Sequence, residues 1–275
     1  MPKRTDLHNL LIIGSGPIII GQAAEFDFSG SQASRSLREE GYRTIIVNSN
    51  PATIQTDQDT ADVVYIEPLD VETITQIIKQ ECPDAILPGF GGQTALNLAY
   101  RLAQEGILKQ HGVVLLGSSF ETIEMAENRE AFRDLLDRLH EPTPLSFVCE
   151  DFDQIQKALE TISFPVLVRP AYTLGGTGGG VAETWDQLEA LAGTGLRRSP
   201  IHQVLIEENL FGWKEFEYEV MRDSKDNCIT ICSMENIHPM GFHTGESIVT
   251  APCQTLTDHE NQQLRTVSLK IVSAL

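Results

Sequence analysis

The sequence predicts an α/β protein in which a Rossmann-like domain with a parallel, doubly wound sheet precedes a second, α+β domain. Up to about residue 126, short apolar segments alternate with amphipathic helical segments, the order typical of parallel strands joined by crossover helices. Beyond Glu127 the strands are shorter and fewer helices separate them. We therefore place one domain at residues 1–126 and a second at residues 127–275.

Each element of the first domain is predicted from the spacing of its apolar residues. Apolar runs predict strands, a period near 3.6 predicts helices, and Gly41 ends the first helix. The predicted strands are 9–13, 42–47, 63–66, 85–87 and 113–116, and the predicted helices are 21–40, 71–80 and 94–104.

The second domain begins with a predicted helix at 129–139, followed by strands around Leu145, Val166, Val181, Val204, Tyr218 and Ile229. Thr257 and Glu260 form a capping-box pattern, and apolar residues at helical spacing follow them. This last helix has no stop signal before Leu275, and the sheet before it lacks a completing strand. We therefore expect the chain to be part of a longer protein.

The chain is strongly acidic. Its 275 residues contain 20 Lys and Arg against 39 Asp and Glu, a net charge of −19, which argues against nucleic acid or an anionic membrane as the main partner. The five cysteines lack C-x-x-C spacing, and Cys228 and Cys232 are expected to share one strand face. The apolar run near the N-terminus is too short for a signal sequence, and no segment approaches a membrane span. A cytoplasmic protein is expected.

The most informative segment is residues 169–180, which read R-P-A-Y-T-L-G-G-T-G-G-G. Glycine lets backbone N–H groups converge on a ligand without a Cβ in the way, and such a concavity favours anions. The preceding strand ends in Arg169, whose guanidinium suits bidentate contact with phosphate. A Walker A loop is excluded because no Lys follows these glycines. The pattern favours a phosphate-binding loop, with a flexible hairpin tip as the alternative.

The loop from Gly14 to Gly21 is similar to a dinucleotide-binding fingerprint but departs from it. Ile19 stands where the third glycine is required, and Asn48-Ser49-Asn50 stands where an acidic residue should follow the second strand. An NAD(P)-dependent oxidoreductase is therefore the weaker alternative, although this loop can still hold a small anion at a helix N-terminus. Segments 48–53 and 89–94 follow strands at the edge where such sheets bind ligands, and ligand contact and ordinary turn chemistry stay equally open.

Three segments of the second domain contain further candidate contacts. One predicted strand ends in Glu207 and Glu208 and leads into the turn 209–213, whose backbone suits the edge of an adenine base. In the next strand the glutamates alternate with apolar residues, so Glu215 at its start is placed to accept ribose hydroxyls, unless this face is simply solvated. His243 lies in a glycine-containing loop, where it is either an anion contact or proton carrier, or a surface residue.

In their order along the chain, these motifs resemble the amino-terminal end of the large subunit of carbamoyl-phosphate synthase. The matching segments span the whole chain and are Met1 to Asp6, Gly14 to Gln22, Asn48 to Thr53, Gly91 to Asn97, Arg169 to Gly180, Gly212 to Glu215 and His243 to Gly245. The resemblance implies a pre-ATP-grasp domain followed by an ATP-grasp domain, truncated at its C-terminal side, that phosphorylates bicarbonate.

The resemblance also implies a role for each matching residue. Arg129 and Arg169 would contact the phosphates of ATP and, with His243, act in catalysis. A lid would form at Gly175 and Gly176. The remaining contacts would be the backbone of Glu208 and Leu210 to adenine, Glu215 to ribose, and Gly241, Phe242 and His243 near the transferred phosphoryl group. Phe242 is bulkier than the aliphatic residue of the family, which suggests a backbone contact.

In the implied reaction, bicarbonate attacks the γ-phosphate of ATP to give carboxyphosphate, ammonia displaces phosphate to give carbamate, and a second ATP site phosphorylates carbamate. The Mg²⁺ or Mn²⁺ ligands would lie beyond Leu275, so no metal ligand is assigned in this chain. A glutamine amidotransferase small subunit would supply ammonia, in a hetero-oligomer that serves arginine and pyrimidine biosynthesis. The competing interpretation is a nucleotide-binding remnant without catalysis.

Overall fold

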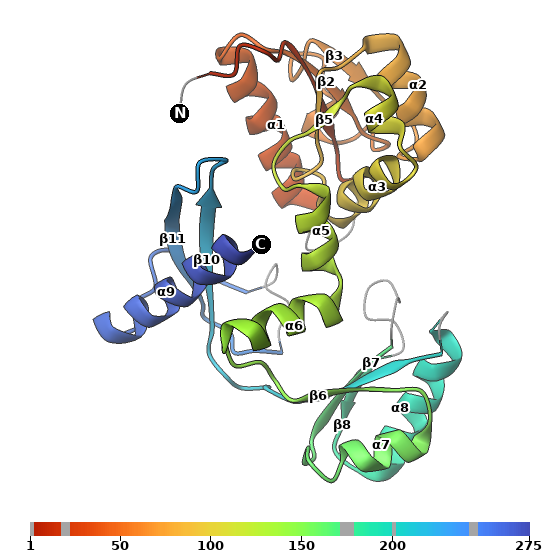
Figure 1. The fold of residues 1–275 in the computed structure, drawn as a ribbon, viewed down its shortest axis with the longest axis vertical. Helices are drawn as coiled ribbons and strands as arrows, with labels where there is room; N and C mark the ends of the chain where they lie inside the picture. Colours follow the sequence, from red (N-terminus) through yellow and green to blue (C-terminus); the bar gives the residue numbers. More distant parts are fainter. Residues whose placement is uncertain (1–2, 18–22, 171–178, 200–201, 242–246) are drawn as a thin grey trace. The chain divides into compact units, whose positions relative to one another are not determined.

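The computed structural model describes residues 3–17, 23–170, 179–199, 202–241 and 247–275, with residues 23, 24, 129 and 130 described by their backbone only (Figure 1). The chain divides into two compact units. The first is formed mainly by Met1–Phe132 and the second by Arg133–Phe242 and Ser247–Ala274. None of the helices in these described ranges combines the length and apolar character needed to cross a membrane.

The first unit contains a parallel five-stranded sheet in the order β3-β2-β1-β4-β5. Its strands are β1 (Asn9–Ile13), β2 (Arg43–Val47), β3 (Val63–Tyr65), β4 (Ala85–Leu87) and β5 (Val114–Leu115). The helices are α1 (Ala23–Glu39), α2 (Val71–Glu81), α3 (Gly92–Gln104), α4 (Ile107–His111) and α5 (Phe120–Glu127), with a 3₁₀ turn η1 (Ile54–Thr56). This strand order confirms the predicted Rossmann-like sheet, and the order reverses between β1 and β4.

The second unit contains a four-stranded antiparallel sheet in the order β6-β9-β7-β8. Its elements are α6 (Arg129–Leu139, which begins in the first unit), β6 (Ser146–Cys149), α7 (Phe152–Ala158), β7 (Val166–Pro170), β8 (Gly180–Ala182), α8 (Trp185–Arg198) and β9 (Val204–Glu208). Alternate residues of the strands, including Val168 and Ile206, form one buried core with Ile155 of α7 and Leu188 of α8. Both helices therefore cover the same face of this sheet.

A three-stranded antiparallel sheet completes the second unit. It contains β10 (Glu215–Arg222), β11 (Cys228–Asn236) and β12 (Val249–Thr250), and α9 (Asp258–Ala274) packs against it. The Tyr218 hydroxyl donates to Asn261 Oδ1 of α9 at 2.5 Å. At the start of α9, the N–H of Thr257 donates to Glu260 Oε2 at 2.8 Å and the N–H of Glu260 donates to Thr257 Oγ1 at 3.3 Å, which confirms the predicted capping box.

Two sequence-based expectations for the second unit need correction. A register shift between Glu219 and Val220 places Cys228 opposite Arg222 and Cys232 opposite Glu219, so the bulge separates the two cysteines onto opposite faces. The expectation of shorter strands was also wrong, since β10 and β11 have 8 and 9 residues and every described strand of the first unit has 5 or fewer. Helices are fewer between these strands, as expected, although α7 and α8 were not predicted individually: α7 has only 7 residues and α8 contains two glycines, which weakens the helical pattern of both.

A buried polar network holds the loops that follow β1 and β2. The fully buried Asn48 accepts hydrogen bonds at Oδ1 from the N–H groups of Gly16, at 3.1 Å, and Asn50, at 3.2 Å. Its Nδ2 donates to Oε1 of the equally buried Gln55 at 3.3 Å, and Gln55 Nε2 donates to the carbonyl of Phe26 at 2.5 Å. The side chains of Asn48 and Gln55 therefore link the turn after β2 to the loop after β1 and to α1.

A second polar cluster joins the edge of this sheet to α2. Arg43 Nη2 lies 2.6 Å from Glu81 Oε2, and the Tyr65 hydroxyl donates to Glu81 Oε1 at 2.6 Å. These two hydrogen bonds, first that from Tyr65 and then that from Arg43, lower the pKa of Glu81, against an opposing effect of burial. Burial and the Glu81 carboxylate raise the pKa of Tyr65 to about 12.

We predict that Gly30→Ala destabilises the first unit, although Gly→Ala inside a helix normally stabilises a protein by roughly 0.5–1 kcal/mol. Gly30 lies in α1, and a Cβ there would lie 2.6 Å from Gln55 Nε2, inside the buried network. We expect the free energy of unfolding to fall by about 1–3 kcal/mol. The matched control is Gly193→Ala in α8, where the nearest atom would be 3.5 Å away and the usual stabilisation is expected. Urea unfolding measures the free energy of unfolding of each variant, and hydrogen exchange shows which unit is destabilised or stabilised.

The Glu81 cluster predicts a pH dependence of stability. Because the pKa of Glu81 is lowered in the folded state, its contribution is complete above the ordinary Glu pKa of 4.5 and is lost as the pH falls through the lower, folded-state pKa. Glu81→Gln should therefore reduce stability near neutral pH and flatten the loss of stability on acidification. Glu67→Gln, at an exposed position in the same unit, is the control. If the free energy of unfolding falls equally steeply on acidification in Glu81→Gln and in the unmodified chain, Glu81 is not the source of this pH dependence.

Candidate functional site

In the described part of the chain, helices cover one face of the four-stranded sheet of the second unit and leave the other face open. Strand register places Val148, Leu167, Val181 and Leu205 on the open face, together with Arg169 and Glu207. Val148 on β6 and Val181 on β8 are 47% and 44% exposed, respectively, and both belong to the outer strands of the sheet. The open face is thus an apolar surface with a charged pair near one end.

Arg169 is the penultimate residue of β7 and directly precedes the glycine-rich segment. Its side chain is 48% exposed, and its Nη2 lies 3.3 Å from Oε1 of Glu207, a carboxylate only 18% exposed. The pair joins adjacent strands, because β7 and β9 are neighbours in the sheet. Sequence reasoning identified Arg169 and missed Glu207 as its partner.

The turn after β9, residues 209–213, pairs three of its backbone donors within the described structure. The N–H of Phe211 donates to Asn209 Oδ1 at 3.0 Å, that of Gly212 to the carbonyl of Met240 at 3.1 Å, and that of Trp213 to the carbonyl of Leu210 at 3.0 Å. Within the described residues, the N–H of Leu210 has no hydrogen-bond partner. This N–H is suited to an external acceptor, such as a ring nitrogen of a base.

The same turn lies beside Gly241, another residue expected at the site. The N–H of Met240 donates to the carbonyl of Trp213 at 2.8 Å. Gly241 has a φ of +112°, and a Cβ there would lie 2.2 Å from Cδ2 of Phe211. A side chain at Gly241 is therefore excluded both by backbone conformation and by the Phe211 ring.

Glu215 begins β10 and faces the same side of its sheet as Glu217 and Asn236. Burial, followed by the charge of Glu217, raises the pKa of Glu215. Asn236 stands directly opposite Glu215 in the register and donates from Nδ2 to Glu217 Oε1 at 2.6 Å. Asn236 is 4% exposed, and its buried Oδ1 has no partner among the described residues. No pattern in the sequence pointed to Asn236.

Several expected site residues lie outside the described part of the chain, namely Gly175, Gly176, Phe242 and His243. Arg129 is the first residue of α6, and only its backbone is described. In the described ranges, no three His, Cys, Asp or Glu side chains gather as a metal site would require. The structure thus places Gly241 beside Phe211, the residue after Leu210, and shows Arg169, Glu208 and Glu215 at or next to the ends of their strands.

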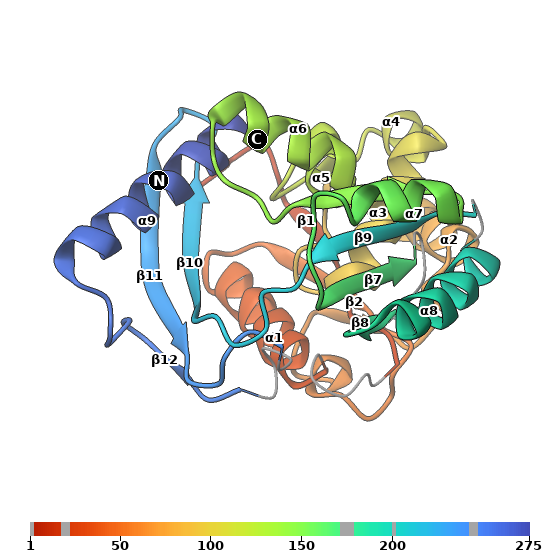
Figure 2. The same cartoon turned by 90° about the horizontal axis from the view of Figure 1, so that it is seen from below.

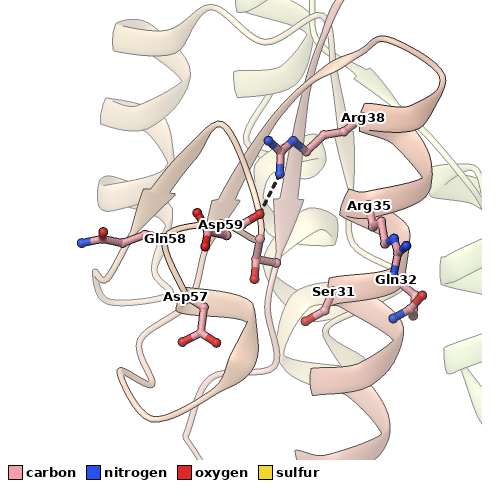
Figure 3. Close-up of a pocket in the computed structure, with 8 residues that line it drawn as sticks. Ser31, Gln32, Arg35, Arg38, Asp57, Gln58 and Asp59 are labelled. Atoms are coloured by element: carbon pink, nitrogen blue, oxygen red, sulfur yellow. Dashed lines mark hydrogen bonds between the residues drawn. The ribbon is translucent and has the colours of Figure 1, made fainter.

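The first unit contains an open polar pocket between α1 and the segment after η1, and none of the expected site residues lines it (Figure 3). Its arginines are already engaged. Arg38 Nη1 donates to the carbonyl of Asp59 at 2.7 Å, and Arg35 Nε lies 3.1 Å from Glu39. With Asp57 and Asp59 on the opposite wall, this pocket offers little net positive charge to a phosphate.

The chain matches two protein families in succession. Residues 6–125 match the carbamoyl phosphate synthase preATP-grasp domain, and residues 128–275 match the carbamoyl-phosphate synthase L chain, ATP binding domain. Carbamoyl phosphate synthase large chains of Methanosphaerula palustris and Methanothrix thermoacetophila are 58% and 56% identical over all 275 residues. The chain spans 26% of the length of these curated relatives.

Solved structures share the fold at low sequence identity. The biotin carboxylase domain of Hydrogenobacter thermophilus 2-oxoglutarate carboxylase, crystallised with MgADP, ADP and bicarbonate, has a TM-score of 0.77 at 17% identity over 98% of this chain and 58% of that one. A Campylobacter jejuni biotin carboxylase in an ATP complex has a TM-score of 0.77 at 18% identity over 98% of this chain and 59% of that one. These neighbours show the fold alone. From the family matches, this chain belongs to the carbamoyl-phosphate synthase large-chain family.

Proposed function

We propose that this chain forms the first ATP-dependent part of a carbamoyl-phosphate synthase, with a pre-ATP-grasp domain at 1–126 and the first part of an ATP-grasp domain at 127–275. Its reaction is the phosphorylation of bicarbonate by ATP to carboxyphosphate. Family membership supports this reaction, and the observation that carries the site is Arg169. This half-exposed guanidinium lies on an open sheet face, at the strand end that leads into the glycine-rich segment.

Each described residue has a role consistent with its geometry. Arg169 has five N–H donors in a fixed plane, so donors turned away from Glu207 can bind phosphate oxygens. The unpaired N–H of Leu210 can donate to adenine beside the backbone of Glu208, and Glu215 can accept a ribose hydroxyl once it is ionised. These groups orient ATP and neutralise charge on its phosphates, which are the main contributions a protein makes to phosphoryl transfer.

The proposal extends to residues outside the described set. Arg129 would contribute a second cation at the phosphates, Gly175 and Gly176 would cover them, and His243 would lie near the transferred group, beside Gly241 and Phe242. The Hydrogenobacter thermophilus neighbour was crystallised with MgADP and bicarbonate, which is consistent with a nucleotide and bicarbonate site here. A divalent ion, Mg²⁺ or Mn²⁺, would draw phosphate oxygens together when bound, but the described residues of this chain present no ligand set for it.

The proposed setting is the cytoplasm, with ammonia supplied by a glutamine amidotransferase small subunit in a hetero-oligomer. Its product would enter arginine and pyrimidine biosynthesis. These features are proposed from family membership, because the chain spans only 26% of its relatives.

The deciding experiment measures ATP hydrolysis with and without bicarbonate in a complete large chain that carries these residues. We expect hydrolysis to depend on bicarbonate and ATP to bind in calorimetry where NADH does not. Binding of ATP without bicarbonate-dependent hydrolysis would instead favour a nucleotide-binding remnant. Tight NADH binding without ATP binding would favour the oxidoreductase.

Arg169 provides a specific prediction within this function. Arg169→Ala removes a charge-assisted hydrogen bond to phosphate, worth roughly 1.5–3 kcal/mol, and should weaken bicarbonate-dependent ATP hydrolysis by about 10- to 100-fold. Arg169→Lys should recover only part of the activity, because an ammonium lacks the fork geometry of a guanidinium. Steady-state kinetics with a matched unfolding curve provide the measurement. Unchanged kinetics in the alanine variant would assign Arg169 to a structural role.

A further inference from the structure

A carboxylate beside a phosphate-binding arginine has an unfavourable electrostatic effect on an anionic ligand. The chain already has a net charge of −19, so the field that ATP meets is repulsive before Glu207 is counted. Glu207 nevertheless lies on the open face of the sheet with its carboxylate 3.3 Å from Arg169. If Glu207 repels the phosphates of ATP, then a second, favourable effect of this carboxylate is needed to explain its position.

The side chains of Glu207 and Arg169 differ in their exposure to solvent. The side chain of Glu207 is 18% exposed, whereas that of Arg169 is 48% exposed. On the open face Glu207 stands opposite Ser146 on one neighbouring strand and Leu167 on the other, so in the described structure Arg169 is the only cation paired with it. A carboxylate that is mostly shielded from solvent and held on a strand is the less mobile partner, and the longer, more exposed arginine is the group that it restrains.

Restraint matters because an arginine side chain has many rotamers. Immobilising such a side chain costs conformational entropy when a ligand binds. An ion pair formed in the absence of ligand removes part of that cost in advance. It also directs one N–H edge of the guanidinium toward Glu207, which leaves the remaining N–H groups for another anion.

We propose that Glu207 is a positioning residue that holds the Arg169 guanidinium in the orientation required for phosphoryl transfer. This inference rests on the proposed function, and it adds a role that neither the sequence motifs nor the family matches assign. Glu207 itself does not contact the nucleotide. It acts through Arg169, so its effect depends on Arg169 being present.

Two physical effects of Glu207 predict opposite results for Glu207→Gln. If only its charge matters, removal of a negative charge near the triphosphate strengthens ATP binding and leaves the turnover number unchanged. If Glu207 positions Arg169, loss of the charge-assisted pair lowers the turnover number by roughly tenfold and does not strengthen ATP binding. The sign of the change therefore distinguishes the two.

The test uses a complete large chain and measures kcat and KM for ATP in bicarbonate-dependent hydrolysis. We expect Glu207→Gln to lower kcat roughly tenfold and Glu207→Asp, which keeps the charge on a shorter side chain, to recover part of it. In an Arg169→Ala background, Glu207→Gln should cause no further loss, since the residue it positions is gone. Glu160→Gln is the matched control, because it removes an exposed carboxylate just after α7, on the covered side of the same sheet.

Two results would overturn the inference while leaving the proposed function intact. One is an active unmodified chain in which Glu207→Gln binds ATP more tightly with unchanged kcat. The other is an equal loss from Glu207→Gln with and without Arg169, which would mean that Glu207 acts independently. If Glu207→Gln lowers the unfolding midpoint, Glu207→Asp replaces it. This variant is then compared in chains with Arg169 and with Arg169→Ala, and its loss of kcat should occur only where Arg169 is present. An unmodified chain without bicarbonate-dependent hydrolysis would contradict the proposed function itself.

Discussion

The candidate site depends on the one-sided burial of the four-stranded sheet in the second unit. Helices α7 and α8 lie beside the strands of this sheet (Figure 2). They pack on alternate residues of β7 and β9, which are fully buried. The same alternation necessarily directs Leu167, Arg169 and Glu207 to the opposite face. A surface with apolar side chains in its centre and an arginine near its edge is suited to a ligand that combines a flat base with a charged tail. Among the described residues, the fold thus leaves the face that contains the candidate site without a helix packed on it.

The two units maintain their loops by different means. In the first unit, buried amides determine loop geometry, because Asn48 and Gln55 satisfy backbone groups of three separate segments. Buried polar groups must be paired, so this arrangement tolerates little displacement. In the second unit, a carboxylate performs a similar task. Glu235, 4% exposed, accepts hydrogen bonds from the N–H groups of Gln254, at 2.8 Å, and Thr255, at 3.0 Å, and so holds the segment before α9.

Local pairing also explains how an acidic chain can recognise an anion. The net charge is repulsive at long range, but such interactions between exposed groups are screened within about 10 Å at moderate ionic strength. Recognition then depends on the groups within hydrogen-bonding distance of the ligand. On the open sheet face the group proposed for this role is Arg169, which is paired with Glu207, and in the adjoining turn the proposed contact to the base is the N–H of Leu210. The polar pocket near Arg38 offers less to an anion because Asp57 and Asp59 line it together with the two arginines (Figure 3).

Features that depend on neighbours along the chain could be predicted from the sequence alone. The apolar runs of β1 and β2 predicted a parallel sheet, Thr257 and Glu260 predicted the start of α9, and the position of Arg169 before the glycines predicted a cationic strand end. Which distant residues meet became known only from the three-dimensional fold. The partnership of Arg169 with Glu207 requires β9 to lie beside β7, and the separation of Cys228 from Cys232 requires a bulge that alternation alone does not reveal. The physical reason is that strand order and register minimise the free energy of the whole sheet, so they cannot be read from any local stretch of sequence.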